Sequence, residues 1–124
     1  MDVNNYLLNN MFTHYLDDFP YLQGQGEDWW SGSVILQKTE PLQGYHAFHC
    51  EDIAWGNRKR VLAWMVYLND VEEGGETSFP KLNFDISPTC GTILLFPPTW
   101  QYRHAGKAPV SNTKYIVGTY LHYT

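Results

Sequence analysis

Two histidines, one cysteine and two acidic residues fall within the ten positions of HAFHCEDIAW, residues 46–55. Side chains of a β-strand alternate between its two faces, so a strand here places His49 and Glu51 on the same face. By the same rule Cys50 points away from them, and so does Asp52 unless the strand has already ended. An imidazole and a carboxylate held in this way are suitable ligands for one metal ion, and the parity excludes Cys50 from that site.

A mononuclear Fe(II) site of the non-haem oxygenase type needs two histidines and one acid on one face of an octahedron, with three positions left open. His104 is the best second histidine, because a jelly roll can bring the second and seventh predicted strands side by side. His14 falls on a predicted helix, His46 has the wrong parity and His122 lies late in the last strand. Taken alone, the H-x-E pair is a weak signal, because a short motif of this kind often occurs by chance.

The first element that could support such a site is a helix. From Asp2, an expected N-cap, an apolar residue recurs at every fourth position until Pro20 ends the pattern. The sequence therefore predicts one amphipathic helix over about residues 2–19. The repeating apolar residues are Val3, Leu7, Met11 and Tyr15, and the stripe is widened by Leu8, Phe12, Leu16 and Phe19.

The rest of the chain, from about residue 29 to 123, consists of short β-branched and aromatic runs separated by turn residues. About eight antiparallel strands with such frequent turns are typical of a sandwich or jelly roll. Gly74 and Gly75 are expected to form a tight turn with φ values that residues bearing a Cβ avoid. The predicted strands are Trp30–Gln37, Tyr45–Glu51, Val61–Leu68, Thr77–Phe79, Leu82–Ile86, Thr92–Phe96, Gln101–His104 and Tyr115–Tyr123.

Composition limits the class of protein. With 124 residues, 44% of them hydrophobic, the chain is expected to form one domain over residues 1–124 with its own core. Its net charge of -5 offers phosphate backbones little to bind, so a nucleic-acid partner is not expected. No signal peptide or apolar stretch of membrane-spanning length is evident, which predicts a soluble, cytoplasmic protein with no membrane partner. Two cysteines allow at most one bridge, and reduced thiols are expected.

Four successive segments resemble the prolyl-4-hydroxylase-like family of Fe(II)/2-oxoglutarate-dependent dioxygenases: GYHAFHCE, RVLAWMVYLNDVEEGGETSFP, PTCGTILLFPP and RHAGKAPVSNTKYIV. The similarity runs from about Gln37 to Leu121, and YLNDVEEGGETSFP is its most specific part. The resemblance implies a mainly β fold, the double-stranded β-helix, which is a cupin-like jelly roll. The N-terminal helix would then pack outside the barrel.

The resemblance also implies roles for individual residues. Iron would be bound by His49, Glu51 and His104, and Lys114 would pair with the C5 carboxylate of 2-oxoglutarate. Tyr67 matches a family tyrosine whose hydroxyl reaches the same carboxylate. The alternatives are a solvated loop lysine at position 114 and an ordinary barrel aromatic at position 67.

A protein of this family would hydroxylate an unactivated C–H bond using Fe(II), 2-oxoglutarate and O2, with release of succinate and CO2. Ascorbate would serve as reductant, and peptidyl proline is the favoured substrate, with a small molecule as the other option. Two alternatives remain: a non-catalytic cupin-like metal-binding or structural module, and a metal-dependent enzyme that does not use 2-oxoglutarate. The sequence leaves the oligomeric state open.

Three positions depart from the family pattern. Glu51 replaces the aspartate that most members have, which keeps a carboxylate but moves it by one methylene. Thr39 replaces a family tyrosine, so one cosubstrate contact is expected to be missing. Only one helix precedes the expected barrel, fewer elements than in members that act on proteins, and this leaves the substrate class open.

Overall fold

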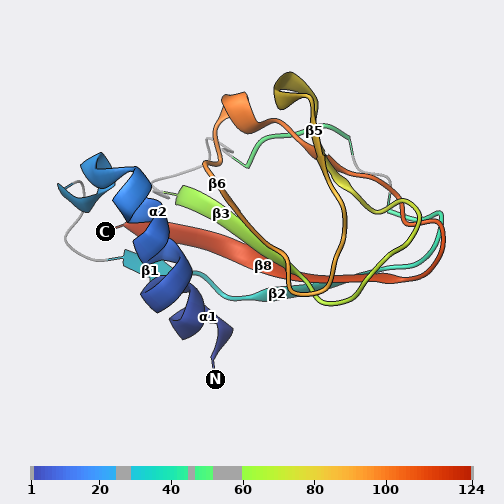
Figure 1. The fold of residues 1–124 in the computed structure, drawn as a ribbon, viewed down its shortest axis with the longest axis horizontal. Coiled ribbons are helices and arrows are strands. Elements are labelled where there is room, and N and C mark those ends of the chain that lie inside the picture. Colours follow the sequence, from blue (N-terminus) through green and yellow to red (C-terminus); the bar gives the residue numbers. More distant parts are fainter. Residues whose placement is uncertain (1, 25–28, 45–46, 52–59, 124) are drawn as a thin grey trace.

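The computed structural model describes residues 2–24, 29–44, 47–51 and 60–123. The chain begins with helices α1 (Val3–Tyr6) and α2 (Phe12–Asp18), which are joined by a π-helical turn. A short 3-10 helix, Pro20–Gly24, follows. The remaining structure is mainly β, in two antiparallel sheets (Figure 1). The expected class, a mainly β jelly roll with an N-terminal helix outside, is confirmed.

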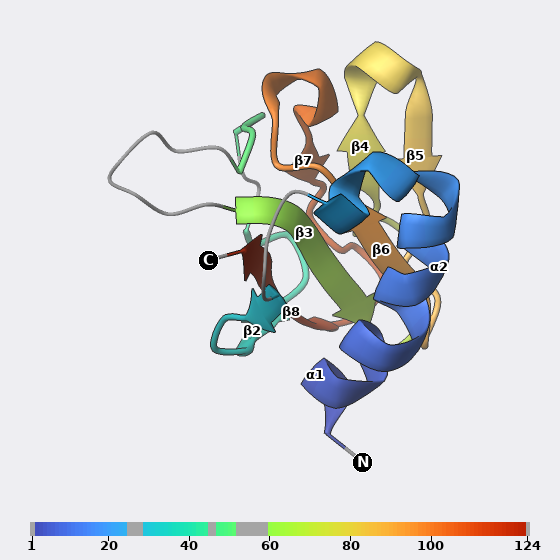
Figure 2. The same cartoon turned by 90° about the vertical axis from the view of Figure 1, so that its left-hand side faces the viewer.

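The predicted N-terminal helix forms, and its apolar stripe packs on the core. Leu7 and Phe12 are its buried residues, and Leu8, Met11, Tyr15 and Leu16 pack against the same cluster. The turn Leu7–Met11 is π-helical, because the backbone N–H of Phe12 donates to the carbonyl of Leu7, five residues earlier. The two ends of the expected stripe, Val3 and Phe19, are exposed. Figure 2 shows the helical segment on the outside of the sheets.

The larger sheet has the strand order β1-β8-β3-β6, and β2 also pairs with β8. Its two central strands, β8 and β3, are the longest, and every pairing in it is antiparallel. The smaller sheet has the order β5-β4-β7. The strands are β1 Trp29–Ser31, β2 Ile35–Thr39, β3 Arg60–Tyr67, β4 Thr77–Phe79, β5 Phe84–Ile86, β6 Ile93–Phe96, β7 Ala105–Gly106 and β8 Lys114–Tyr123.

The run that was predicted as one strand over residues 30–37 is divided into β1 and β2. Along β8, Ser31 lies opposite Leu121 and Ile35 lies opposite Gly118. The advance of four residues from Ser31 to Ile35 thus lies opposite an advance of only three residues along β8. This excess of one residue is typical of a β-bulge.

Two other expected strands are not regular strands. Over residues 101–104 the chain forms a 3-10 helix, Trp100–Tyr102, because the N–H of Tyr102 donates to the carbonyl of Thr99 at 3.0 Å. The preceding prolines, residues 97–98, have no N–H to donate to a ladder. Of the expected strand over residues 45–51, positions 45 and 46 lie outside the described residues, and 47–51 contain only one isolated bridge.

Strand β3 separates two core clusters because its side chains alternate. Leu62 and Trp64 face the N-terminal helix, where they pack with Leu7, Phe12 and Leu121. The opposite face of β3 turns toward the space between the two sheets. There Ala63 and Tyr67 pack with Phe79, Leu94 and Phe96. Burial of each large apolar side chain stabilises the fold by about 1.5–3 kcal/mol, and the second cluster forms one wall of the site described below.

The turn before β4 confirms the expected role of its glycines. Gly74 and Gly75 both have φ of 76°, and a Cβ on Gly74 would lie 2.4 Å from the carbonyl oxygen of Ala108. Cys50 and Cys90 are free thiols, as expected. In the described part of the chain, no helix has the length and apolar character needed to cross a membrane.

Candidate metal centre

The two segments that were expected to converge lie next to each other. His49 and His104 face one another in an antiparallel bridge. The N–H of His49 donates to the carbonyl of His104 at 2.9 Å, and the N–H of His104 donates to the carbonyl of His49 at 2.8 Å. This bridge sets the two imidazoles side by side, with ring centroids 4.6 Å apart.

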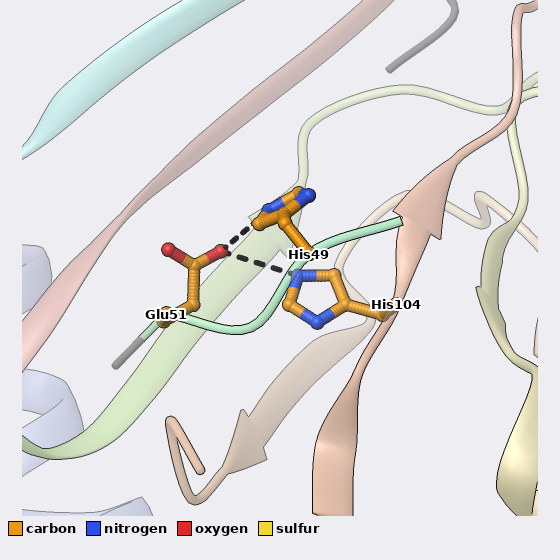
Figure 3. A group of neighbouring side chains, drawn as sticks. All are labelled: His49, Glu51 and His104. Carbon is orange, nitrogen blue, oxygen red and sulfur yellow. Dashed lines mark hydrogen bonds and ion pairs between the residues drawn. The ribbon is translucent and has the colours of Figure 1, made fainter. Parts of the chain in front are cut away.

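The three side chains selected from the sequence point toward one another (Figure 3). Oε1 of Glu51 lies 3.0 Å from Nε2 of His49 and 3.2 Å from Nε2 of His104. One ligand atom from each residue lies within 4.8 Å of the other two. His46 and Asp52, the candidates that parity had placed on the other face, lie outside the described residues. Cys50 does not belong to the cluster.

The hydrogen bonds of the two imidazoles set which nitrogen is available to a metal. Nδ1 of His49 lies 2.9 Å from the carbonyl oxygen of Ala47, and Nδ1 of His104 lies 2.8 Å from that of Tyr102. A carbonyl can only accept, so each Nδ1 carries the proton and donates it. With Nδ1 committed to a backbone carbonyl, Nε2 is the nitrogen that each imidazole offers on the side of Glu51. Three electron-pair donors facing one point fit a cation between them.

Aromatic packing holds the buried histidine in place. The ring of His104 lies 5.3 Å from that of Phe79 and 4.9 Å from that of Phe96, centroid to centroid. Only 7% of the His104 side chain is exposed, whereas 45% of the His49 side chain is exposed. The two phenylalanines, which sequence analysis did not connect with the site, thus orient one of its candidate ligands.

Two further residues contact Glu51. The hydroxyl of Tyr120, on β8, donates a hydrogen bond to Oε2 of Glu51. Nη1 of Arg60, at the start of β3, donates to the backbone carbonyl of Glu51 at 2.8 Å. Sequence analysis missed both contacts. The alternation of side chains along a strand could have indicated Tyr120, because it lies on the same face as Lys114, six residues earlier.

These contacts change the acidities of the pair. Burial raises the pKa of the Glu51 carboxyl, but hydrogen bonds from His104 and Tyr120 and the charges of His49 and His104 outweigh it and lower the pKa to about 2. For Tyr120, burial and then the hydrogen bond to Glu51 raise the pKa to about 12. Glu51 is therefore a carboxylate and Tyr120 a neutral phenol at neutral pH, as a ligand and a hydrogen-bond donor require.

A cavity of about 730 Å³ extends from the cluster between the sheets. Lys114 on β8 and Thr77 on β4 line it, together with His49, Glu51 and His104. Lys114 is only 5% exposed, and its Nζ donates to the carbonyl of Gly75 at 3.1 Å. Within the described ranges Lys114 forms no ion pair. Burial lowers the pKa of Lys114, and the charge of Glu76 opposes the shift. Lys114 is therefore a buried cation facing a cavity, not a solvated loop lysine.

Tyr67 and Thr39 differ in whether they line the cavity. Tyr67 is fully buried, and its hydroxyl lies 2.5 Å from Oγ1 of Thr77. Among the described residues that line the cavity, Thr77 is present and Tyr67 is not. Burial raises the pKa of Tyr67, which keeps it a neutral phenol. Thr39 lies opposite Lys114 across the β2–β8 ladder and lines the cavity with a short side chain.

Comparison with known proteins identifies what this arrangement is similar to. The sequence profile of the 2OG-Fe(II) oxygenase superfamily matches residues 1–122. Among characterised proteins, the prolyl 4-hydroxylase subunit alpha-1 of Gallus gallus is 31% identical over 74 residues. That match covers 54% of this chain and 14% of the subunit, so the chain corresponds to a small part of it.

Solved structures give the same result for the fold. A truncated viral collagen prolyl hydroxylase from Paramecium Bursaria Chlorella virus-1 superposes with a TM-score of 0.77 and 25% identity, over 100% of this chain and 71% of that one. The 2OG complex of the viral enzyme superposes with a TM-score of 0.72 and 25% identity, over 100% of this chain and 76% of that one.

Proposed function

This chain belongs to the 2OG-Fe(II) oxygenase superfamily, and from that membership and the geometry of the cluster we propose that it is an Fe(II)- and 2-oxoglutarate-dependent hydroxylase. The observation that carries the proposal is the convergence of two imidazole Nε2 atoms on one carboxylate oxygen. Two histidines and one acid on one side of a ferrous ion leave positions open for cosubstrate and O2.

The iron would be held by His49, Glu51 and His104. The carbonyls of Ala47 and Tyr102 keep the protons of both imidazoles on Nδ1, so that both Nε2 atoms remain available. When bound, Fe(II) and 2-oxoglutarate would supply the oxidising chemistry, which consumes O2, releases succinate and CO2 and places one oxygen atom in a C–H bond of the substrate. The protein would contribute ligand geometry and a cavity with a buried end at Lys114 and Thr77 and an exposed rim at Ile35 and Leu36.

Lys114 would bind the distal carboxylate of 2-oxoglutarate. A buried ammonium that has only a carbonyl partner is costly, and the carboxylate of a ligand would supply the missing opposite charge. The Thr77 hydroxyl lines the same cavity and is positioned by Tyr67. We therefore assign the direct contact to Thr77 as well as Lys114, and the contact of Tyr67 with the cosubstrate stays a prediction.

For the substrate we propose a peptidyl proline. The characterised relative is named as a prolyl 4-hydroxylase subunit, and the viral neighbour is named as a collagen prolyl hydroxylase. Ile35 and Leu36 on β2 line the cavity and are 55% and 65% exposed, which gives its rim an apolar character suited to a pyrrolidine ring.

The single-domain organisation and the cytoplasmic location stay predictions.

The test is succinate formation with Fe(II), ascorbate, O2 and 2-oxoglutarate, measured against proline-containing peptides with free amino acids alongside. We expect succinate in every reaction that contains iron, at a higher rate when a peptide is hydroxylated. Hydroxyproline in the peptide, detected by mass, identifies the substrate class. A protein that forms no succinate with any peptide or without one would contradict the proposal.

The main alternative is a cupin-like metal-binding module without turnover. The buried, cavity-facing Lys114 favours the hydroxylase, because a module that binds metal alone has no use for a cation there. Both Mn(II) and 2-oxoglutarate should raise the unfolding temperature of a hydroxylase, whereas only the metal should stabilise the module. Lys114→Met should abolish the stabilisation by 2-oxoglutarate and preserve that by Mn(II).

A further inference from the structure

The two carboxylate oxygens of Glu51 have different surroundings. Oε1 faces Nε2 of His49 at 3.0 Å and Nε2 of His104 at 3.2 Å. Oε2 accepts a hydrogen bond from the hydroxyl of Tyr120, on a strand that is remote in sequence. The side chain of Glu51 is 18% exposed, so the arrangement lies mostly out of solvent. One oxygen is thus directed to the metal position and the other is held by the protein.

Tyr120 is itself held in place by Arg60. The guanidinium carbon of Arg60 lies 3.8 Å from the centroid of the Tyr120 ring, a cation–π contact. Nη1 of the same arginine donates to the backbone carbonyl of Glu51 at 2.8 Å. Arg60 therefore contacts the backbone of Glu51 directly and its carboxylate through Tyr120. The three residues come from three separate segments, residues 47–51, β3 and β8.

A glutamate needs such support more than a shorter acid does. Its side chain has one more rotatable bond than aspartate, so more conformations must be excluded before one oxygen faces the metal. A carboxylate also has two equivalent oxygens that can both bind a metal ion. A phenol bound to Oε2 removes one of these oxygens from the metal side and restricts the rotation of the carboxylate.

We propose that Tyr120 is a positioning residue that makes Glu51 a one-oxygen metal ligand, and that Arg60 holds Tyr120 in the orientation this requires. The inference rests on the proposed function, because it takes the cluster to be a metal site. Tyr120 lines the same cavity, and in this role its hydroxyl contacts the carboxylate of Glu51. It acts through Glu51, and residues that orient a ligand in this way commonly change metal affinity by about 10–100-fold.

The first experiment measures the affinity of the metal-free protein for Mn(II) by calorimetry, with Mn(II) as the only ligand. Tyr120→Phe removes the hydroxyl and keeps the ring under Arg60, so the loss can be assigned to one hydrogen bond. We expect the affinity to fall by about 10-fold or more. The matched control is Tyr115→Phe, an exposed tyrosine on the same strand, which should bind Mn(II) as the parent does.

The second experiment is a double-mutant cycle with Glu51→Asp, which keeps a carboxylate but shortens its reach toward Tyr120. In that background Tyr120→Phe should change the Mn(II) affinity by less than about threefold, because the hydrogen bond is already lost. A general packing defect would instead lower the affinity equally in both backgrounds. The Mn(II) electron paramagnetic resonance spectrum should also change on Tyr120→Phe with Glu51 present, since the carboxylate is free to bind through both oxygens.

The outcomes separate the two proposals. If the parent protein binds no Mn(II), the proposed function is wrong and the inference is wrong with it. If the parent binds Mn(II) and Tyr120→Phe binds it within about twofold of the parent, only the inference is wrong. Equal losses in the Glu51 and Glu51→Asp backgrounds would also overturn the inference and leave the metal site in place.

Discussion

The two ends of the cavity are built in different ways. At the proposed metal end, formed by His49, Glu51 and His104, the segment of the first histidine has one backbone bridge among its described residues, and this bridge pairs His49 with His104. Its side chain is 45% exposed. At the lysine end, formed by Lys114 and Thr77, both side chains project from regular strands and are buried.

The difference shows how much each end depends on its ligand. The lysine end is fixed by the ladders of β8 and β4 and by core packing, so it should have the same form with and without 2-oxoglutarate. The metal end has few backbone hydrogen bonds on the side of His49, and its three candidate ligand atoms lie within 4.8 Å of one another. Its order should therefore increase on metal binding, because the cation links two segments that are otherwise joined weakly.

The largest expected effect is the loss of activity when either histidine of the metal end is replaced, and the unfolding temperatures of the two variants should differ. His49→Ala should lower succinate formation by more than about 100-fold, since loss of a ligand should cost more than loss of a residue that only orients one. Because His49 is partly exposed, the variant should unfold at nearly the parent temperature. His104→Ala should lose activity equally and also unfold at a lower temperature, because its ring fills a space between Phe79 and Phe96.

The control for both is His14→Ala, an exposed residue of the N-terminal helix, which should retain activity and stability. Succinate formation by His104→Ala at the parent rate would contradict the assignment of the metal end.

Hydrogen exchange tests the difference between the two ends directly. Mn(II) at about 100 times its Kd stabilises the bound form by about 2.7 kcal/mol, which is about 100-fold in an opening equilibrium. We expect the amides of His49 and His104 to exchange more slowly by up to about this factor. The amides of β8 around Lys114 should change little. Equal protection at both ends would show that they do not differ in this respect.

Loss of the buried cation should affect the cosubstrate and leave the metal largely unaffected. Removing one member of a buried charge pair costs about 2 kcal/mol or more, which is about 30-fold in affinity. Lys114→Met should therefore raise the KM for 2-oxoglutarate by about 30-fold with little change in Mn(II) affinity. The matched control is Lys107→Met, an exposed lysine paired with Asp85, which should leave the KM unchanged.

The smallest expected effect is a pH dependence of stability without ligand. Burial lowers the pKa of Lys114, so the ammonium is less favourable in the folded state than in the unfolded state. This cost is fully present below the folded pKa and disappears as pH rises past the ordinary lysine value of about 10.4. Lys114→Met should thus be more stable than the parent near neutral pH, by a margin that shrinks toward high pH. Urea denaturation at several pH values measures this margin, and a margin that grows with pH would contradict the assignment.

Residue types and strand alternation predicted the three candidate metal ligands, and the family resemblance predicted Lys114. The side chains of His49 and Glu51 point the same way although residues 47–51 form no regular strand, because any extended backbone alternates its side chains. The bridge to His104 agrees with the expected proximity of two distant segments. The burial of Lys114 favours the cosubstrate role over that of a solvated loop lysine.

Other features of the site were not predictable from one sequence. The position of Thr77 between Tyr67 and the cavity depends on how the smaller sheet packs against the larger one. The contact of Tyr120 with Glu51 joins residues that are 69 positions apart. The π-helical turn at Leu7–Met11 was likewise not expected from the apolar repeat of the N-terminal helix.

The sequence by itself determined which side chains are available, which of them share a face, and where the chain turns, because these properties depend on local backbone geometry. The tertiary structure decided which faces meet, which imidazole nitrogen is available to a metal, and which oxygen of Glu51 is already occupied. These depend on distances across two packed sheets, which are set by core packing, bulges and strand register rather than by any short run of residues.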